Sequence, residues 1–127
     1  MNRFVTVGTS MLIGTAIGAA AVQALHAQAK PKAYTVTEIE VTDTTALAAY
    51  TPLVQGVIKN AGGRNFNTAG GKVVSFVGEA PKRVAINEFD SLAQAEAFVS
   101  SAAYKNIAPQ RDKAEKVVRQ YAVEALN

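Results

Sequence analysis

Two side chains of opposite charge are the first candidates for chemistry in this sequence. Glu88 lies between Ile86 and Phe89 in a run of strand-forming residues, so we expect it in a strand. A carboxylate that faces an apolar cavity has a raised pKa and can carry a proton, which makes Glu88 the candidate catalytic acid or base. Arg111 lies on an expected helical stretch after Tyr104, where its planar guanidinium can bind a carboxylate ligand.

Both residues also have a structural interpretation, which the sequence leaves open. The Glu88 carboxylate can instead pair with an arginine, and Arg64, Arg83 and Arg111 are available for this. Arg111 can equally pair with Asp112 or lie on a solvated helix face. A water-accessible cavity shared by Glu88 and Arg111 would favour chemistry, whereas a closed ion pair between them would favour structure.

Four further residues are candidates for binding a ligand. Arg64 begins an expected strand and could line the mouth of the same cavity, and Asn67 could orient a ligand carbonyl. Tyr50 and Tyr104 lie on apolar helical stripes, where a tyrosine is either a core aromatic or a group that faces a ligand. The Gly70-Gly71 pair lacks the strand-to-helix context and the following Lys of a phosphate-binding loop.

The composition excludes several classes of chemistry. The 127 residues contain no Cys, and residues 30–127 also contain no His, Met or Trp. Disulfides, thiolate metal sites, His-based triads and His-ligated haem are therefore excluded, so we expect no metal and no cofactor. In residues 30–127, 12 Lys and Arg mix with 10 Asp and Glu, which favours a solvated surface over a nucleic-acid interface.

The N-terminal segment predicts export. Arg3 is followed by an uncharged stretch from Phe4 to Leu25, and Ala27-Gln28-Ala29 has the A-x-A pattern of a signal-peptidase site. We therefore expect residues 1–29 to be a signal peptide, cleaved between Ala29 and Lys30, and the mature protein to be periplasmic or secreted. The alternative is an uncleaved anchor, because 22 uncharged residues could just span a bilayer. No membrane association is expected after cleavage.

Residues 30–127 predict a single domain whose elements alternate between strand and helix. Alternating β-branched residues predict a strand at Tyr34–Val41, and Asp43 can cap a helix that runs to Asn60 and ends at Gly62-Gly63. Pro52 should kink or split that helix. The later elements are expected as a hairpin of Arg64–Thr68 with Lys72–Val77, a strand at Lys82–Phe89, a helix capped by Asp90-Ser91, a helical stretch at Ala103–Lys116 interrupted by Pro109, and a closing strand at Val117–Val123.

This element order predicts the fold class and a partner. A split β-α-β unit of this kind is an α+β, ferredoxin-like fold, with an antiparallel sheet and its helices on one face. The other face of the sheet also carries apolar side chains. Packing two such sheets face to face would bury them, so we expect a homodimer, a dimeric α+β barrel.

An ordered series of residues resembles one known family. The series comprises Asp43, Tyr50, Gly62-Gly63-Arg64, Gly70-Gly71, Gly78, Pro81-Lys82-Arg83, Glu88-Phe89, Ser91, Ala95, Tyr104 and Arg111. In this order the residues are similar to the family called domain of unknown function 1330, in the dimeric α+β barrel superfamily, over about residues 33–126. The sequence departs from the family pattern at Ala69, where an Arg is frequent, and at Phe98-Val99. The resemblance implies no agreed activity, although relatives in the superfamily include cofactor-free monooxygenases and lactone isomerases.

Two functions remain open from the sequence. The first is an exported protein that binds a small, anionic or aromatic molecule between sheet and helices, with cofactor-independent proton transfer or oxygenation. In that case Glu88 would be the acid or base, and Arg64 and Arg111 would bind the anion. The second is a dimeric binding or structural module without enzymatic activity.

Overall fold

The computed structural model describes residues 30–126, and the expected signal peptide lies outside the described residues. Strand β1 (Ala33–Val41) is followed by helix α2 (Thr44–Asn60) and by the short strand β2 (Arg64–Asn65). A loop over residues 66–82 leads to strand β3 (Arg83–Phe89). Helices α3 (Leu92–Ser100), α4 (Ala102–Asn106) and α5 (Ala108–Ala114) then precede the closing strand β4 (Glu115–Glu124).

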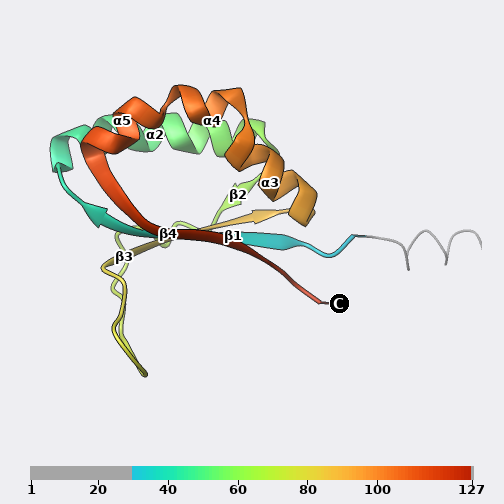
Figure 1. Ribbon diagram of the computed structural model, residues 1–127, viewed down its shortest axis with the longest axis horizontal. Helices are drawn as coiled ribbons and strands as arrows, with labels where there is room; N and C mark the ends of the chain where they lie inside the picture. Colours follow the sequence, from blue (N-terminus) through green and yellow to red (C-terminus); the bar gives the residue numbers. More distant parts are fainter. Residues whose placement is uncertain (1–29, 127) are drawn as a thin grey trace, which may run out of the picture. The chain divides into compact units, whose positions relative to one another are not determined.

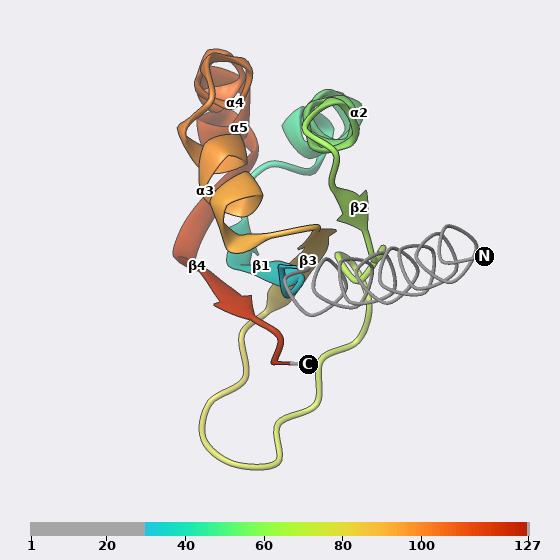
Figure 2. The same ribbon diagram turned by 90° about the vertical axis from the view of Figure 1, so that its right-hand side faces the viewer.

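The four strands form one antiparallel sheet, which confirms the predicted fold class. Their order is β2-β3-β1-β4, so the two strands that begin and end the domain lie side by side. The helices all cover one face of this sheet, as Figures 1 and 2 show, with α2 beside the group formed by α3, α4 and α5. This is the ferredoxin-like arrangement that the split β-α-β pattern predicts.

Alternation along β1 and β3 decides which side chains face the helices. Ala33, Thr35 and Thr37 of β1 are buried beneath the helices, and in β3 the buried residues Asn87 and Phe89 point the same way. Because successive strand residues point to opposite faces, the residues between them lie on the outer face of the sheet.

The apolar core lies between the sheet and the helices α2, α3 and α4. Phe89 stacks on Phe98 with ring centroids 5.2 Å apart, and Phe98 in turn contacts Tyr104 at 4.7 Å. Ile58 at the end of α2 packs on this aromatic cluster. Gly62 follows the helix with a φ of 81°, a left-handed conformation that glycine adopts without a steric penalty, as the sequence predicts.

The predicted hairpin is wrong. Strand β2 has only two residues, and Lys72–Val77 is not a strand, although Val73, Val74 and Val77 favour one. Asn67 and Gly70 both have a positive φ, which turns the chain away from the sheet edge, so this segment has no strand to pair with. The loop over residues 66–82 instead projects beyond the outer face of the sheet (Figure 1).

Two predicted helix boundaries also differ from the structure. Pro52 does not split α2, which is a single helix from Thr44 to Asn60. The final helical stretch breaks at Ile107, with Pro109 in the first turn of α5, where a missing N–H costs no hydrogen bond.

Strand β4 begins at Glu115, two residues earlier than the sequence predicts, and this difference determines where the Glu115 side chain lies. Within residues 30–126 no helix is long and apolar enough to cross a membrane.

Candidate functional site

A cavity of about 110 Å³ lies between the sheet and the helices that cover it. Its helical side is mainly apolar and aromatic, formed by Leu47, Val54 and Ile58 of α2 together with Phe98 and Tyr104, and α2 adds the polar Thr51 and Gln55. These residues belong to α2, α3 and α4, whose positions over the sheet are visible in Figure 2. The size suits one small ring or a short chain, because an engineered cavity of about 150 Å³ holds benzene, whereas drug-sized ligands need roughly 300 Å³ or more.

The sheet side of the cavity carries uncharged polar side chains beside the apolar Ile39 and Ala85. Asn65 Nδ2 donates a hydrogen bond of 2.7 Å to Asn87 Oδ1, and Asn87 Nδ2 lies 3.3 Å from Thr35 Oγ1. Farther along the sheet, Gln120 Nε2 donates to Thr37 Oγ1 at 3.2 Å. Amides and hydroxyls fixed in this way can bind carbonyl and hydroxyl groups of a ligand.

Glu115 is the carboxylate on the cavity wall. It begins β4, is only 7% exposed, and within residues 30–126 no cationic group lies within 4 Å of it. Burial raises the pKa of Glu115, because the charged form loses its hydration, and the charges of Arg83 and Arg111 oppose this only in part. A carboxyl group whose pKa burial raises can take up and release a proton at a higher pH than an exposed carboxyl group does.

Tyr50 adds a hydroxyl to the same wall. It lies on α2, is 4% exposed and lines the cavity. Burial raises the pKa of Tyr50, and the nearby Tyr104 and Glu115 raise it further, so the hydroxyl stays protonated. Tyr50 and Glu115 are therefore close enough for the charge of one to affect the ionisation of the other.

Arg83 is the one basic residue on the cavity lining in the part of the chain that the structure describes. It begins β3, and its guanidinium packs against Gly70, where an added Cβ would lie 3.6 Å from the nearest guanidinium nitrogen. Asn67 and Ala69 of the same loop also line the cavity. The loop over residues 66–82 therefore forms one rim of the cavity at its beginning and leaves the sheet at its tip.

The sequence-predicted site residues separate into two groups. Tyr50, Asn67 and Tyr104 line the cavity. Arg111 lies beside it, with its guanidinium carbon 5.5 Å from the centre of the Tyr104 ring and its Nε 3.3 Å from Asp112 Oδ1. Arg111 therefore supports the cavity wall and does not face its interior.

Glu88 and Arg64 lie away from the cavity. Glu88 alternates with Asn87 and Phe89 and so lies on the opposite face of β3, where its Oε1 is 3.3 Å from Lys32 Nζ and 3.7 Å from Arg64. Burial would raise the pKa of Glu88, but the hydrogen bond and charge of Lys32 outweigh it and lower that pKa. The catalytic role predicted for Glu88 stays a prediction, and Glu88 and Arg111 neither share a cavity nor pair with each other.

The two charged residues of the cavity lining are not evident from the sequence, for identifiable reasons. The sequence offers Arg83 only as a possible partner of Glu88, although the period of two that buries Phe89 also turns Arg83 towards the helices. Glu115 was assigned to the last turn of a helix, and a helical residue gives no alternation from which its direction can be predicted. Among residues 30–126 the structure contains no cluster of acidic or His residues suited to a metal ion.

Fold and cavity together define a small α+β domain with a ferredoxin-like sheet and a ring-sized cavity beneath its helices. The chain belongs to the family described as domain of unknown function 1330, which matches residues 32–126 and so confirms the sequence resemblance. No curated protein matches the chain.

Solved structures with a similar fold include proteins of unknown function. A crystal structure of such a protein from Rhodopseudomonas palustris is 19% identical, with a TM-score of 0.60 over 77% of this chain and 85% of that one. The methylated form of that protein gives a TM-score of 0.58 at 19% identity, over 77% and 83% of the two chains. HapK from Hahella chejuensis is 16% identical, with a TM-score of 0.45 over 74% of this chain and 92% of its own. These similarities concern the fold alone.

Proposed function

We propose that the domain binds a small organic molecule, about the size of one ring, in the cavity between the sheet and the helices. The observation that carries this proposal is the contrast between the two sides of the cavity. A mainly apolar, aromatic side accepts a flat hydrocarbon surface, and a side rich in amides and hydroxyls accepts its polar substituents.

Any reaction at this site is proposed to be proton transfer without a cofactor. Glu115 is the group that would give or take the proton, because burial has already raised its pKa. Arg83 would attract a ligand that carries negative charge. This replaces Glu88 by Glu115 as the candidate acid, and Arg64 and Arg111 by Arg83 as the candidate anion-binding group.

The binding proposal is tested by filling the cavity. Ala85 lines it, so Ala85→Leu places additional atoms where the ligand would lie, whereas Ala97→Leu makes the same change at an exposed position on α3. Single-ring compounds with polar substituents should shift the amide resonances of cavity residues in the wild-type protein and in the Ala97→Leu variant, but not in Ala85→Leu. Compounds that bind all three proteins equally, or none of them, would favour a structural module.

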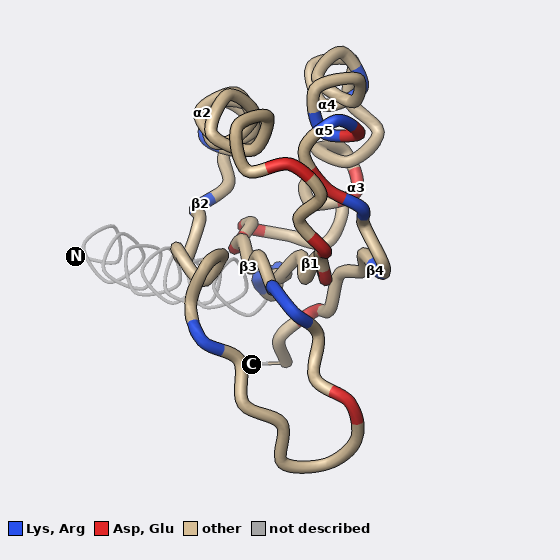
Figure 3. Tube along the Cα trace, turned by 90° about the vertical axis from the view of Figure 1, so that its left-hand side faces the viewer, with Lys and Arg blue, Asp and Glu red and all other residues tan. Residues whose placement is uncertain are grey.

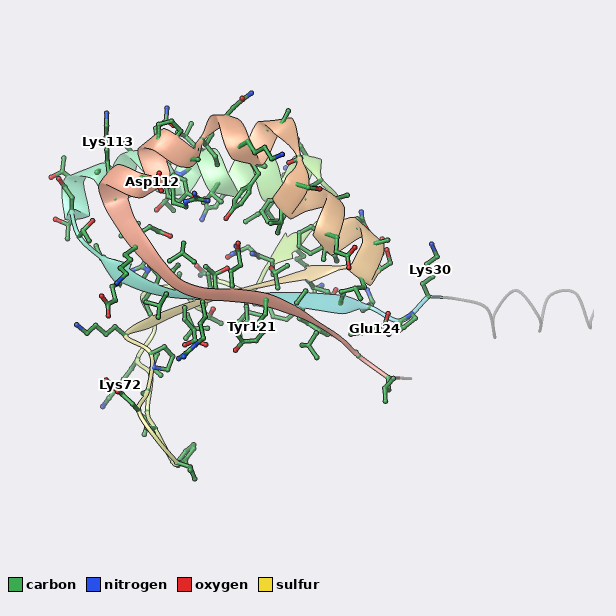
Figure 4. All side chains as sticks on the ribbon, viewed as in Figure 1. Lys30, Lys72, Asp112, Lys113, Tyr121 and Glu124 are labelled. Carbon is green, nitrogen blue, oxygen red and sulfur yellow. The ribbon has the colours of Figure 1, made fainter. Side chains whose placement is uncertain are left out.

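The proposed partner is a second copy of the chain. The outer face of the sheet carries Tyr34, Val36, Ile86, Tyr121 and Val123, and Tyr121 and Val123 are about half exposed, at 49% and 53%. Figure 4 shows Tyr121 extending from the side of the sheet opposite the helices. Burying an apolar sheet face against its own copy is favourable, which supports a homodimer.

The loop over residues 66–82 supports the same partner. In Figure 3 its tip carries no charged position between Lys72 and Glu79, and Phe76 and Val77 at that tip are 94% and 96% exposed. Figure 1 shows the loop extending on the outer side of the sheet, where a second copy would lie.

Export through the N-terminal segment is also proposed, with cleavage after Ala29 and a periplasmic or secreted product.

A further inference from the structure

The loop over residues 66–82 ends in an apolar tip that the described part of its own chain leaves uncovered. Phe76 and Val77 are almost fully exposed, and no charged residue lies between Lys72 and Glu79. Figures 1 and 3 both show the loop directed away from the sheet, on the side opposite the helices. Exposed apolar side chains grouped in this way are typical of a contact surface.

A groove of about 270 Å³ beside the edge strand β4 offers a complementary surface. It lies between β4 and helix α3, and its exposed surface is mainly apolar. The apolar residues that line it are Ala95, Val99, Tyr121 and Ala122, and the polar ones are Thr35, Glu96, Ser100 and Gln120. The groove is large enough for a phenylalanine ring with a valine beside it, because a cavity of about 150 Å³ already holds benzene.

The length of the loop brings its tip to an edge of a second sheet. Lys72 already lies on the outer side of the sheet in Figure 4, and Phe76 is four residues farther along. At about 3.3 Å per residue these residues extend up to roughly 13 Å, whereas two sheets packed face to face lie only about 10 Å apart. In the proposed homodimer the tip therefore reaches past the sheet of the other copy, beside one of its edges. Strand β4 forms the long edge, since β2 has only two residues.

A two-fold axis connects the loop of one copy with the groove of the other. The loop joins the sheet where β3 begins, and Arg83 there pairs with Ile39 near the end of β1. The groove lies at the opposite edge, where Ala122 pairs with Thr35 near the beginning of β1. An axis that runs diagonally across the strands exchanges these two positions. Such an axis gives the nearly perpendicular strand crossing of orthogonally packed sheets.

We propose that Phe76 and Val77 of one copy insert into the groove between α3 and β4 of a second copy. The inference rests on the proposed homodimer and names the residues through which its two copies contact each other. Because the axis is two-fold, the contact occurs twice in each dimer. Tyr121 lines the groove and also reaches Glu38 on the outer face of the sheet, so the loop contact and the sheet contact form one continuous interface.

The first measurement detects contacts between copies directly. Isotope-labelled and unlabelled protein are mixed, and an isotope-filtered nuclear Overhauser spectrum records only contacts between the two kinds of chain. Residues 30–127 are used because they contain every strand and helix of the described sheet and core. The proposal expects contacts from the Phe76 ring to the Val99 methyl groups. Contacts of Phe76 with a different surface, or none in a dimeric protein, would overturn the inference and leave the homodimer standing.

Substitutions at exposed positions test the energetic importance of the contact. Phe76→Ser removes the apolar tip, and Val99→Glu adds a charge to the groove. Each should raise the dissociation constant of the dimer by about tenfold or more, as measured by sedimentation. The matched controls Leu53→Ser on α2 and Ala97→Glu on α3 are also at exposed positions and should leave the constant unchanged.

The remaining outcomes separate this inference from the homodimer on which it rests. If Phe76→Ser and Val99→Glu both dimerise as tightly as the wild type, the inference is wrong and the sheet contact alone forms the dimer. If the wild type stays monomeric at millimolar concentration, the homodimer itself is contradicted. A monomer that binds phosphatidylglycerol vesicles, and loses this binding in Phe76→Ser, would assign the tip to a membrane surface and overturn the inference.

Discussion

Gln120 donates hydrogen bonds to the hydroxyl of Tyr104 at 3.1 Å and to the hydroxyl of Thr37 at 3.2 Å. One amide group thus connects the closing strand β4 both to the neighbouring strand β1 and to helix α4. Thr37 and Tyr104 are each 7% exposed, so their hydroxyls have little access to other partners. This connection joins the sheet to the helices on the wall of the cavity, which all three residues line.

Gln120→Leu should destabilise the domain by roughly 1–3 kcal/mol, because it leaves two buried hydroxyls without their donor. Tyr104→Phe removes the hydroxyl from the other side. The double variant should lose less stability than the sum of the two single variants, because it removes both partners of one hydrogen bond. Urea unfolding of the four proteins measures this coupling, and strictly additive losses would show that the Gln120–Tyr104 bond is not energetically important.

Glu115→Gln should remove part of the pH dependence of stability. The folded protein keeps a proton on Glu115 above pH 4.5, the ordinary pKa of the group, where the unfolded chain has released it. Wild-type stability should therefore fall as pH rises from 4.5 to the raised pKa of folded Glu115, and stay at the lower level above it.

In the Glu115→Gln variant this fall should be absent, and near neutral pH the variant should be more stable, by on the order of 1 kcal/mol. Glu38 and Glu88 do not obscure the effect, because hydrogen bonds from Arg119 and Lys32 respectively lower their pKa values, and their contributions are lost at more acidic pH. Thermal melts from pH 4 to 8 check the prediction, with Glu124→Gln as control. Parallel curves for Glu115→Gln and the wild type would contradict a raised pKa.

Gly63→Ala should destabilise the domain by about 1–3 kcal/mol, because a Cβ at this position meets the core. It would lie 2.6 Å from Cε1 of Phe89 and 2.9 Å from Cγ2 of Ile58, and Phe89 is 1% exposed and has no room to move. Gly56→Ala is the control, since nothing lies within 4 Å of its Cβ, and alanine is favoured over glycine inside a helix by roughly 0.5–1 kcal/mol. Denaturant unfolding should move the two variants in opposite directions.

Tyr121→Glu should dissociate the proposed homodimer. The substitution adds a charge to the outer sheet face near Glu38, whose carboxylate lies 2.7 Å from Arg119 and accepts a hydrogen bond from the Tyr121 hydroxyl. Light scattering of residues 30–127 should give twice the chain mass for the wild type and a single mass for the variant. Asp112→Lys, on the helical side, should remain dimeric (Figure 4). A monomeric wild-type protein would exclude the dimer.

Expression of the full sequence in a bacterium with two membranes should give a periplasmic product that begins at Lys30. The basis is the Ala27-Gln28-Ala29 pattern at the end of the uncharged segment. Intact-mass measurement of the periplasmic fraction identifies the terminus. Ala27→Lys and Ala29→Lys together should block cleavage, because the peptidase requires small residues at these positions. A full-length chain retained in the membrane would instead favour the anchor.

The regular elements could be predicted from the sequence because their signals are local. Alternation over Tyr34–Val41, capping by Asp43 and Ser91, and the stop at Gly62 depend on residues only a few positions apart. The order of these elements then predicts the split β-α-β topology and the antiparallel sheet, and the ordered residue series indicates the family. The exclusion of thiol and imidazole chemistry follows from composition alone.

The candidate site needed the tertiary structure, because it depends on which side of a strand each charge occupies. Glu88 lies one position away from the inward-facing Asn87 and Phe89, so its side chain is on the outer face of the sheet. Glu115 faces the cavity because β4 begins at this residue, earlier than the sequence predicts. The segment Lys72–Val77 has the residues of a strand but no neighbouring strand, and a strand without a hydrogen-bonded partner does not form. Pairing, strand register and burial are long-range properties, so only the assembled sheet and helices decide them.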